Sequence, residues 1–497
     1  MNKYDIIIIG SGLGGLVCGY ILSKHGYHVA ILEQGAQVGG CLQTFRRMGV
    51  KFDTGMHYIG SMEEGQVLHK LFGYFNLLND VKVSRLDDEG FDVISMAGRQ
   101  YKYAVGYDRF IDTLAQDFPN NKEDIRRYTE LIRNIAAASP LYNMHKIDTQ
   151  QFIDVDYVKK SINESIAGIT SNVLLQNVLA ANQPLYAGVK DKTPIYIHAL
   201  ISNFYIQSAW RIVGGSDSIA QSLSRSIQAN GGAILTNCKV EHIVCNESRA
   251  TAVVLVNGER FEADSFISNA HPQTTLRMLD THLVRKAYRD RVNGLEDTIA
   301  NFTVYIKLKE NTTPYLNYNY YFYEDADVWK SADYDVAKYP SSYLYMHQCH
   351  QPNPRYAQSA EMICYMRYDE VRQWEHTHVG HRGDDYLAFK EFKAQQMLAA
   401  LERSFPGINS CIEGYETSSP LTYRDYTGTH EGSMYGIIRD KNFPTQTLVS
   451  QRTKVPNLFL TGQNINSHGI LGVSIGSAIT CAEFLGLNTI IDEIMNA

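Results

Sequence analysis

The sequence predicts an α/β fold in which a discontinuous Rossmann-like domain carries an inserted α+β domain, made of an antiparallel sheet plus helices. A strand, a glycine-rich turn, a helix and a second strand follow one another over residues 4–33. A strand, a glycine turn and a helix recur over residues 457–485, and helix and strand patterns of the same kind return over residues 212–270. These three segments are expected to share one sheet, so the stretches between them are insertions.

The N-terminal segment has the pattern of a dinucleotide site. Residues 5–9 form a short apolar run, typical of a strand that is buried on both faces. Gly10, Gly12 and Gly15 follow with G-x-G-x-x-G spacing, and Gly14 is an additional glycine. Gly10 permits a tight turn, Gly12 leaves room for a pyrophosphate, and Gly15 lets the next helix pack closely on the strand.

The second strand, residues 28–32, ends in an acidic residue, Glu33. A carboxylate at this point accepts hydrogen bonds from a ribose diol, and its charge repels a 2′-phosphate, which argues against NADP at this site. The helix N-terminus offers unpaired N–H groups and a positive dipole end to the phosphates. We therefore predict that a dinucleotide contacts Gly10, Gly12, Leu13, Gly14, Gly15, Glu33 and Gln34.

Two further glycine segments favour FAD over NAD. Gly39 and Gly40 suit a loop that folds back over the pyrophosphate of a long cofactor, although an ordinary surface turn has the same pattern. Near the C-terminus a strand at residues 457–464 leads to a helix expected at residues 473–485. The N-terminus of that helix would stabilise negative charge on a reduced flavin, whereas a simple closing helix is the alternative. The predicted FAD site thus adds Gly39, Gly40, Gly462, Gln463, Gly472 and Val473.

Length and composition set limits on the function. A chain of 497 residues is expected to form two or more domains, and a net charge of −7 gives no reason to expect nucleic acid as a partner. The eight cysteines are scattered without a C-x-x-C pair, which favours free thiols in a reducing cytoplasm. The apolar N-terminal run is interpreted as the first strand rather than a signal peptide, and no stretch has the ~20 apolar residues of a membrane-spanning helix.

In order along the chain, we expect FAD-binding segments at residues 1–80, 206–298 and 421–497, and substrate-domain segments at 81–205 and 299–420. Between 206 and 298 the pattern predicts a helix at 219–230 and strands at 233–235 and 239–244, followed by a hairpin and a last short strand. The hairpin spans residues 252–262 around the Asn257-Gly258 turn, and the last strand covers 266–270.

The substrate segments differ in character. Helices are expected over 108–114, 123–138 and 173–181 in the first segment. In the second, strands are expected at 302–308, 318–323, 342–345 and 361–368, and a long helix at 384–405. Many residues here are tyrosines, so the sheet either lines an apolar cavity or forms a tyrosine-rich core. His376, His378 and His381 lie in a glycine-containing loop, and we predict no metal site.

Six motifs together resemble the phytoene desaturase and carotenoid isomerase superfamily of FAD-dependent oxidoreductases, and within it the retinol saturase branch. The first and last are shared by many flavoproteins, whereas FDTGMHYIG and the segment at 417–436 are more specific. The motifs are GSGLGG (10–15) with Glu33, Gly39-Gly40, FDTGMHYIG (52–60), VGGSDSIAQSL (213–223), TSSPLTYRDYTGTHEGSMYG (417–436) and TGQNINSHGILGVSIGSA (461–478).

The resemblance implies an enzyme that exchanges hydride with C=C bonds of an apolar polyene or isoprenoid, by saturation, desaturation or isomerisation. It also implies that the strand around Val240 contacts the adenine and that substrate is taken from a membrane surface. Candidate proton-transfer residues near the flavin are His57, Tyr58, Tyr426 and His468, with a purely structural role for His57 equally consistent.

Three questions stay open at this point. No second G-x-G-x-x-G follows a strand, so electrons come from NAD(P)H that binds transiently or from a partner reductase. A flavin amine oxidase and a non-enzymatic prenyl- or lipid-binding escort protein are the alternative functions. The retained glycines and Glu33 argue against the escort protein. We expect a cytoplasmic protein, with peripheral contact to the inner face of the cell membrane as a further expectation.

Overall fold

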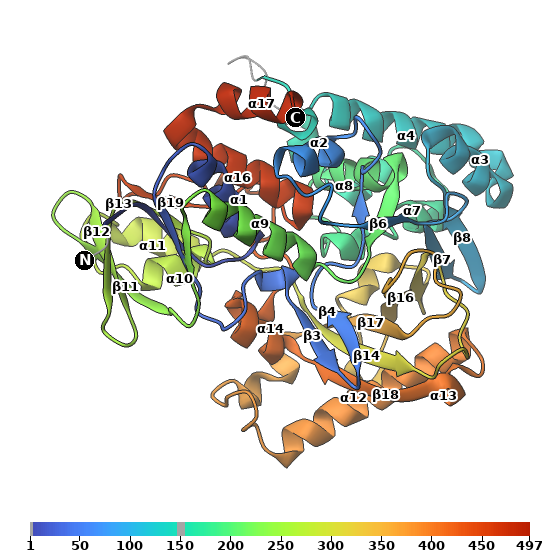
Figure 1. Ribbon diagram of the computed structural model, residues 1–497. Helices are drawn as coiled ribbons and strands as arrows, with labels where there is room; N and C mark the ends of the chain where they lie inside the picture. The colour runs from blue at the N-terminus through green and yellow to red at the C-terminus, as the bar shows by residue number, and fades with distance from the viewer. Residues whose placement is uncertain (1–2, 147–154) are drawn as a thin grey trace.

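The computed structural model describes residues 3–146 and 155–497, and it has the expected mixed α/β fold with two large sheets (Figure 1). The first sheet has the order β10-β2-β1-β13-β12-β11, with β19 paired to β13. Its β2, β10, β13 and β19 run parallel to their neighbours, whereas β11, β12 and the start of β13 form an antiparallel meander. The strands are β1 (Lys3–Ile9), β2 (Val29–Leu32), β10 (Ala233–Leu235), β11 (Val240–Cys245), β12 (Ala250–Leu255), β13 (Arg260–Ser268) and β19 (Leu458–Leu460).

Three helices pack together on one face of this sheet, and they explain its apolar strands. They are α1 (Leu13–Lys24), α9 (Asp217–Ala229) and α16 (Gly469–Leu485). Isoleucines of β1 alternate between this helical layer, which takes Ile6 and Ile8, and a second core on the far face, which takes Ile7 and Ile9. A strand buried on both faces has to be apolar throughout, as the sequence pattern indicated.

The second sheet has the order β18-β14-β17-β16-β15-β7-β8. It separates two cores: helices α3 (Tyr107–Asp117), α4 (Lys122–Ala137) and α8 (Ile195–Gln207) cover one face, and α12 (Asp384–Ser404) covers the other. Tyr321 faces the first group and Tyr320 the second, as alternate residues of a strand must. The strands are β7 (Asp92–Met96), β8 (Arg99–Tyr103), β14 (Ala300–Leu308), β15 (Asn319–Tyr323), β16 (Ser342–His347), β17 (Ser359–Met366) and β18 (Ile412–Ser418).

Short strands connect the segments between the two large sheets. β3 (Thr44–Arg47) and β4 (Val50–Asp53) form a hairpin, and β5 (Ile59–Gly60), β9 (Ala209–Ile212) and β6 (Val83–Arg85) form a small antiparallel sheet. That small sheet joins residues on both sides of the expected boundaries at 80 and 205, so those domain limits stay a proposal.

Three expectations about individual elements are corrected. The return strand of the hairpin and the expected last strand at 266–270 are one continuous strand, β13. The second sheet is mixed rather than wholly antiparallel, because β7 from the first insertion pairs with β15 in parallel. Finally, α16 begins at Gly469, four residues before the expected start. Gly472 and Val473 therefore lie within the first two turns of the helix and not at its first residue.

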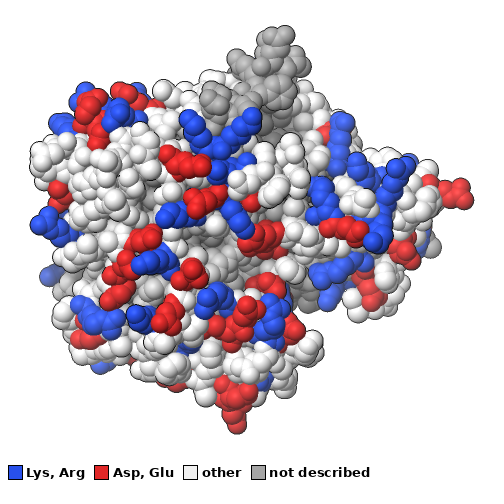
Figure 2. Space-filling model, turned by 180° about the vertical axis from the view of Figure 1, so that it is seen from behind, with Lys and Arg blue, Asp and Glu red and all other residues white. Residues whose placement is uncertain are grey.

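The helices expected in the first insertion are present. Expected helices near 108, 123 and 173 are α3, α4 and α7 (Val173–Leu179). None of the helices over the described ranges is both long and apolar enough to span a membrane. Figure 2 shows Lys and Arg interspersed with Asp and Glu over most of the face seen from behind.

The close packing of α1 on β1 generates a stability prediction. A Cβ at Gly15 would lie 2.0 Å from the carbonyl oxygen of Gly10, and a backbone atom cannot move aside as a flexible side chain can. We expect Gly15→Ala to destabilise the protein by about 3 kcal/mol, the upper end of ordinary overpacking, which thermal unfolding will show as a lowered midpoint.

Gly73→Ala in α2 (Val67–Tyr74) is the matched control. A Cβ at Gly73 would meet its nearest neighbour, the carbonyl oxygen of Ala497, at an ordinary contact distance of 3.5 Å. Alanine also favours a helix by up to about 1 kcal/mol relative to glycine. Equal unfolding midpoints for the two variants would show that the packing of α1 on β1 has no such constraint.

Candidate active site

Glycine backbones crowd together where β1, β13 and β19 end, at one edge of the first sheet. A Cβ at Gly14 would lie 2.9 Å from the backbone of Gly462, and one at Gly12 would lie 2.8 Å from the side-chain amide of Asn269. Asn269 directly follows β13 and its amide also lies against Gly462. These three segments therefore form a cradle of backbone with almost no side chains, which suits a pyrophosphate at the N-terminus of α1.

The second glycine pair packs onto the first. Gly39 pairs with Gly12 as an isolated parallel bridge, and its N–H donates to the carbonyl oxygen of Ser11 at 3.1 Å. A Cβ at Gly40 would lie 3.0 Å from Gly12 Cα, and Gly40 has a positive φ of 56°. Residues 39–40 thus close over the glycine turn, as the sequence predicts for a loop that covers the pyrophosphate.

Glu33 is buried and holds this turn in place. Its Oε2 accepts hydrogen bonds from the N–H of Ser11 at 2.9 Å and from the Ser11 hydroxyl at 2.6 Å, and its Oε1 accepts one from Gly35 N–H at 2.8 Å. Each carboxylate has about four acceptor positions, so Oε1 keeps capacity for a ribose hydroxyl. Glu33 therefore has a structural task that the sequence pattern did not reveal.

The remaining predicted contacts lie at the two ends of this cradle. The chain just before β11 is tied to the end of β2, since Cys238 N–H donates to Glu33 O at 2.8 Å, and Val240 follows two residues later as a buried residue. Gln34 lies on the same side, with its amide 3.7 Å from the position of a Cβ at Gly428. At the other end, Leu13, Gly39, Gln463, Gly472 and Val473 line a cavity.

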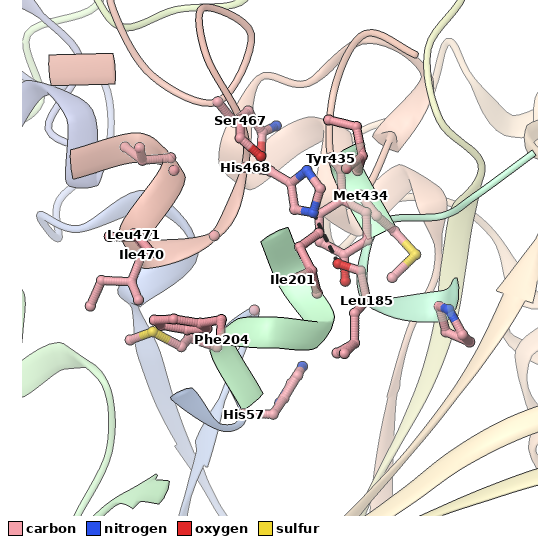
Figure 3. A pocket seen from close by; sticks show the side chains of 18 of the residues that line it. His57, Leu185, Ile201, Phe204, Met434, Tyr435, Ser467, His468, Ile470 and Leu471 are labelled. Atoms are coloured by element: carbon pink, nitrogen blue, oxygen red, sulfur yellow. Dashed lines mark hydrogen bonds between the residues drawn. The ribbon is translucent and has the colours of Figure 1, made fainter. Parts of the chain in front are cut away.

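That cavity has a volume of about 500 Å³ and extends from the N-terminus of α16 to the second sheet. Alkyl and aromatic side chains dominate its lining, and no Asp, Glu, Lys or Arg is among the lining residues that the structure describes. Figure 3 shows part of it, with Phe204, Leu185 and Ile201 between His57 on one side and His468 on the other. The cavity therefore accepts an apolar molecule beside the glycine cradle.

His57 points into the cavity from the segment between β4 and β5 (Figure 3). Its Nδ1 lies 2.8 Å from Oε2 of Glu361, a fully buried carboxylate on β17. Burial opposes a charged imidazole, but the carboxylates of Glu361 and Asp53 outweigh it, so the pKa of His57 is raised above its ordinary value despite Arg211 nearby. Burial raises the pKa of Asp53 to about 6, even though Ser216 donates two hydrogen bonds to it.

Tyr58 also lines the cavity, but its hydroxyl is engaged internally. It lies 2.7 Å from the Tyr321 hydroxyl and donates to Oδ2 of buried Asp92 at 3.1 Å. Asn319 donates to the other oxygen of Asp92 at 2.7 Å, and burial raises the pKa of this carboxyl to about 7. Burial also raises the pKa of the Tyr58 hydroxyl, so this residue stays neutral.

His468, at the N-cap of α16, is a neutral imidazole. Burial lowers its pKa to about 4, and its Nε2 lies 3.0 Å from the carbonyl oxygen of Leu185 and therefore carries the hydrogen. Its ring packs against Tyr435 with centroids 4.4 Å apart. A neutral, hydrogen-bonded imidazole positions the start of α16 but is a poor proton donor.

The structure does not bring Tyr426 to the cavity. This residue lies on α14 (Pro420–Thr427), is 57% exposed and is absent from the cavity lining, whereas Tyr423 of the same helix does line it. The two tyrosines lie on nearly the same face of the helix, but three residues advance about 4.5 Å along its axis, and Tyr426 at the last turn of α14 reaches solvent instead. Glu361, Asp92 and Asn269 were also not identified from the sequence as residues of this site. Only Asn269 could have been found, because it lies in the predicted strand 266–270, at the sheet edge where a ligand is expected.

No ligand-like cluster supports a metal in the described ranges. Groups of three or more His, Cys, Asp or Glu side chains in metal-binding geometry do not occur there. His378 and His381 face each other as a bridge of backbone in the loop before α12, and the His376 side chain is 91% exposed.

A backbone cradle for a dinucleotide, a second helix N-terminus beside it and an adjoining apolar cavity define a flavin-dependent oxidoreductase. Comparison with known proteins agrees. The model of the flavin containing amine oxidoreductase family matches residues 13–483, and the chain belongs to that family.

Individual relatives share about a quarter of their residues with this chain. All-trans-retinol 13,14-reductase of Rattus norvegicus is 27% identical over 98% of this chain and 86% of its own length. Phytoene desaturase (neurosporene-forming) of Cereibacter sphaeroides is 23% identical over 96% and 93%. These matches confirm the resemblance drawn from the motifs. Cyclohexylamine oxidase of Brevibacterium oxydans superposes with a TM-score of 0.62 over 100% of this chain and 99% of its own at 13% identity, which shows the fold alone.

The cradle generates a prediction about flavin binding. In Gly12→Ala the new Cβ would lie 2.8 Å from Asn269 Nδ2, the far end of a side chain that can move, so we expect a folded protein. The same methyl group blocks close approach of the pyrophosphate, and we expect at least a tenfold loss of flavin affinity, measured by absorbance of purified protein and by flavin titration.

The double variant Gly12→Ala/Asn269→Ala separates the two effects. It removes the side chain that the methyl group meets, so any loss in unfolding midpoint should be relieved while flavin affinity stays low. Recovery of flavin binding in the double variant would show that Gly12 acts only by accommodating Asn269.

Proposed function

We propose that this protein is an FAD-dependent oxidoreductase that acts on C=C bonds of an apolar polyene or isoprenoid-like substrate. The observation that carries the proposal is the 500 Å³ apolar cavity that adjoins the glycine cradle. A hydrocarbon chain gains about 25 cal/mol for each Å² of apolar surface it buries there, with no Asp, Glu, Lys or Arg among the described lining residues to desolvate. The named activities of the curated relatives support the same substrate class.

FAD, rather than a shorter flavin, is supported by the places of the predicted contact residues, which lie at two separate ends of the site. Glu33 and the segment before Val240 lie at one end of the cradle, whereas Gln463, Gly472 and Val473 line the cavity at the other. An adenosine ribose at Glu33 and an isoalloxazine ring at α16 require a cofactor that extends between them. We propose that Gly10, Gly12, Leu13, Gly14, Gly15, Gln34, Gly39, Gly40 and Gly462 contact its central part.

A reduced flavin bound at this site would supply the hydride for a double bond of the substrate. The chain supplies the rest: the cavity orients the substrate and excludes water, and the first N–H groups of α16 provide a positive dipole end beside the ring. Saturation in addition needs a proton donor, desaturation needs a base, and isomerisation needs neither in net terms.

The cavity lining disfavours the amine oxidase alternative. No carboxylate is among the described lining residues, and the buried carboxylate of Glu361 behind the lining is already paired with His57, so no anionic group there is left to compensate an ammonium substrate. A neutral polyene needs no such compensation. The escort-protein alternative is disfavoured by the intact cradle, which a lipid-binding protein without flavin would not need.

We further propose that the cavity opens toward a membrane surface, at the inner face of the cell membrane. Leu448 lines the cavity and is nevertheless 55% exposed, and Phe443 on the same loop is 53% exposed. Apolar side chains at a cavity mouth insert into the interfacial region of a bilayer. The electron source is proposed to be NAD(P)H that binds transiently or a partner reductase.

Substrate class is tested by anaerobic turnover. Dithionite-reduced protein mixed with retinol-like and carotenoid polyenes should bleach the polyene absorbance and reoxidise the flavin, and mass spectrometry should show a gain of 2 Da. Oxidised protein mixed with putrescine or cyclohexylamine should keep its flavin oxidised. Flavin reduction by the amines without any reaction with polyenes would overturn the proposal.

Membrane contact is tested by vesicle flotation. The double substitution Phe443→Ser/Leu448→Ser should lower vesicle-bound protein by at least threefold, because each exchange removes an apolar side chain worth about 1.5–3 kcal/mol when buried. Phe392→Ser on α12 is the matched control, since Phe392 is 61% exposed and does not line the cavity. Equal loss in both proteins would argue against a docking role for the cavity mouth.

A further inference from the structure

The ion pair between His57 and Glu361 is unusual for its position. Glu361 lies on β17, in the interior of the second sheet, between β14 and β16. Its side chain is fully buried, whereas the His57 side chain is 16% exposed and lines the cavity. The pair thus joins a carboxylate that no solvent reaches to an imidazole that faces the substrate space.

The two oxygens of Glu361 have different partners. Gln348 donates to Oε1, whereas Oε2 has no hydrogen-bond partner among the described residues and is compensated by His57 Nδ1 at 2.8 Å. A buried carboxylate without a cation is strongly unfavourable, so the charge on Glu361 calls for a charged imidazole. Asp53 adds a second carboxylate near His57, and Arg211 on β9 opposes both.

We propose that His57 is the proton donor for saturation of the substrate double bond, and that Glu361 is the positioning residue that keeps its imidazole charged and aimed. This inference rests on the proposed function, and it specifies direction and roles within the same site. Nδ1 faces Glu361, which leaves Nε2–H as the group presented to the cavity.

The step balances in atoms and electrons. The C=C bond would become a CH–CH bond as His57 Nε2 gives a proton to one carbon, with the hydride for the other carbon coming from a reduced flavin held at the glycine cradle. Oxidised flavin and a neutral imidazole remain, and the imidazole regains its proton from water after product leaves. Desaturation would need a neutral His57 as base before the reaction, which the pair with Glu361 disfavours.

The other candidates fit this step less well. His468 is neutral with its one N–H directed to Leu185, and the Tyr58 hydroxyl donates to Asp92. Tyr426 lies outside the cavity lining. Among the four candidates from the sequence, His57 alone lines the cavity and has a protonated form that a buried carboxylate stabilises, whereas the carboxylate behind Tyr58 takes up the hydrogen of its hydroxyl.

The first test measures the charge on His57 without any turnover. Histidine labelled with ¹³C and ¹⁵N gives up to 16 titrating signals, and the signal absent from His57→Gln identifies His57. We expect its pKa to lie above the ordinary value of about 6.5, and to fall by at least about one unit in Glu361→Gln. Glu361→Asp, which shortens the carboxylate but keeps its charge, should retain part of the increase.

Glu370→Gln is the matched control. Glu370 is also a largely buried carboxylate of this domain, but it pairs with Lys393 at 2.6 Å and does not line the cavity. The His57 titration should therefore be unchanged in that variant. An unchanged His57 titration in Glu361→Gln as well would overturn the positioning role.

The second test follows the reaction. His57→Gln should lower the rate of polyene saturation by about 10²–10⁴-fold, with flavin content and the reduction of the bound flavin by dithionite unchanged. In the wild type the rate should fall as pH rises through the His57 pKa, because the protonated form is the donor. In Glu361→Gln this fall should move to lower pH, with at least a tenfold lower rate at pH 7 and recovery on acidification.

The outcomes separate the two proposals. Wild-type protein that converts no polyene contradicts the proposed function, while the titration still decides whether Glu361 sets the charge on His57. Saturation by wild type together with an unimpaired His57→Gln contradicts only the role of His57. A pH profile that Glu361→Gln does not shift contradicts the role of Glu361.

Discussion

The structure depends on one steric constraint, the approach of three chain segments at the ends of β1, β13 and β19 to distances that only glycine backbones allow. A Cβ at Gly14 or Gly15 would fall within 2.9 Å of a neighbouring backbone atom. α1 starts directly from the turn after β1, and α16 follows the Gly462 turn after a short segment and packs against α1, so the N-termini of the two helices are held close to the same edge of the sheet. The close packing that assembles the first sheet therefore also shapes the proposed cofactor site.

The second sheet adds a different kind of constraint, a set of buried carboxylates behind an apolar cavity. Glu361 and Asp92 both lie in its strands, at 0% and 1% exposure, and each contacts a cavity residue from the segment 55–60: His57 in one case, Tyr58 in the other. One carboxylate compensates a cation, whereas the other accepts from a neutral hydroxyl. The motif FDTGMHYIG thus places His57 against a carboxylate of β17, as an ion pair, and Tyr58 against a carboxylate of β7, as a hydrogen bond from a neutral hydroxyl.

Much of the first domain could be read from the sequence, and much of the second could not. Residues 5–9 and the glycine spacing predicted β1 and α1 because local pattern alone determines them. The local hairpin of β7 and β8 around Ala97-Gly98 was missed. The pairing of β7 with β15 could not be predicted from local pattern, because the paired residues are more than two hundred positions apart in the chain. The pairing of His57 with Glu361 is equally non-local, and a glutamate within the apolar run of β17 gives no hint of its partner. Only side chains tied to a local motif, such as Glu33, could be placed in the site beforehand.

The parallel pairing of β7 with β15 has a consequence for how the protein is made. Asn319 hydrogen-bonds to Asp92 across 227 residues, and the chain between them includes α9 and most strands of the first sheet. A ribosome must therefore deliver a large part of the flavin domain before the edge of the substrate sheet can close. Each of the two large sheets is built from separate stretches of the chain, so an exchange of either sheet between related proteins would have to transfer several interleaved segments at once.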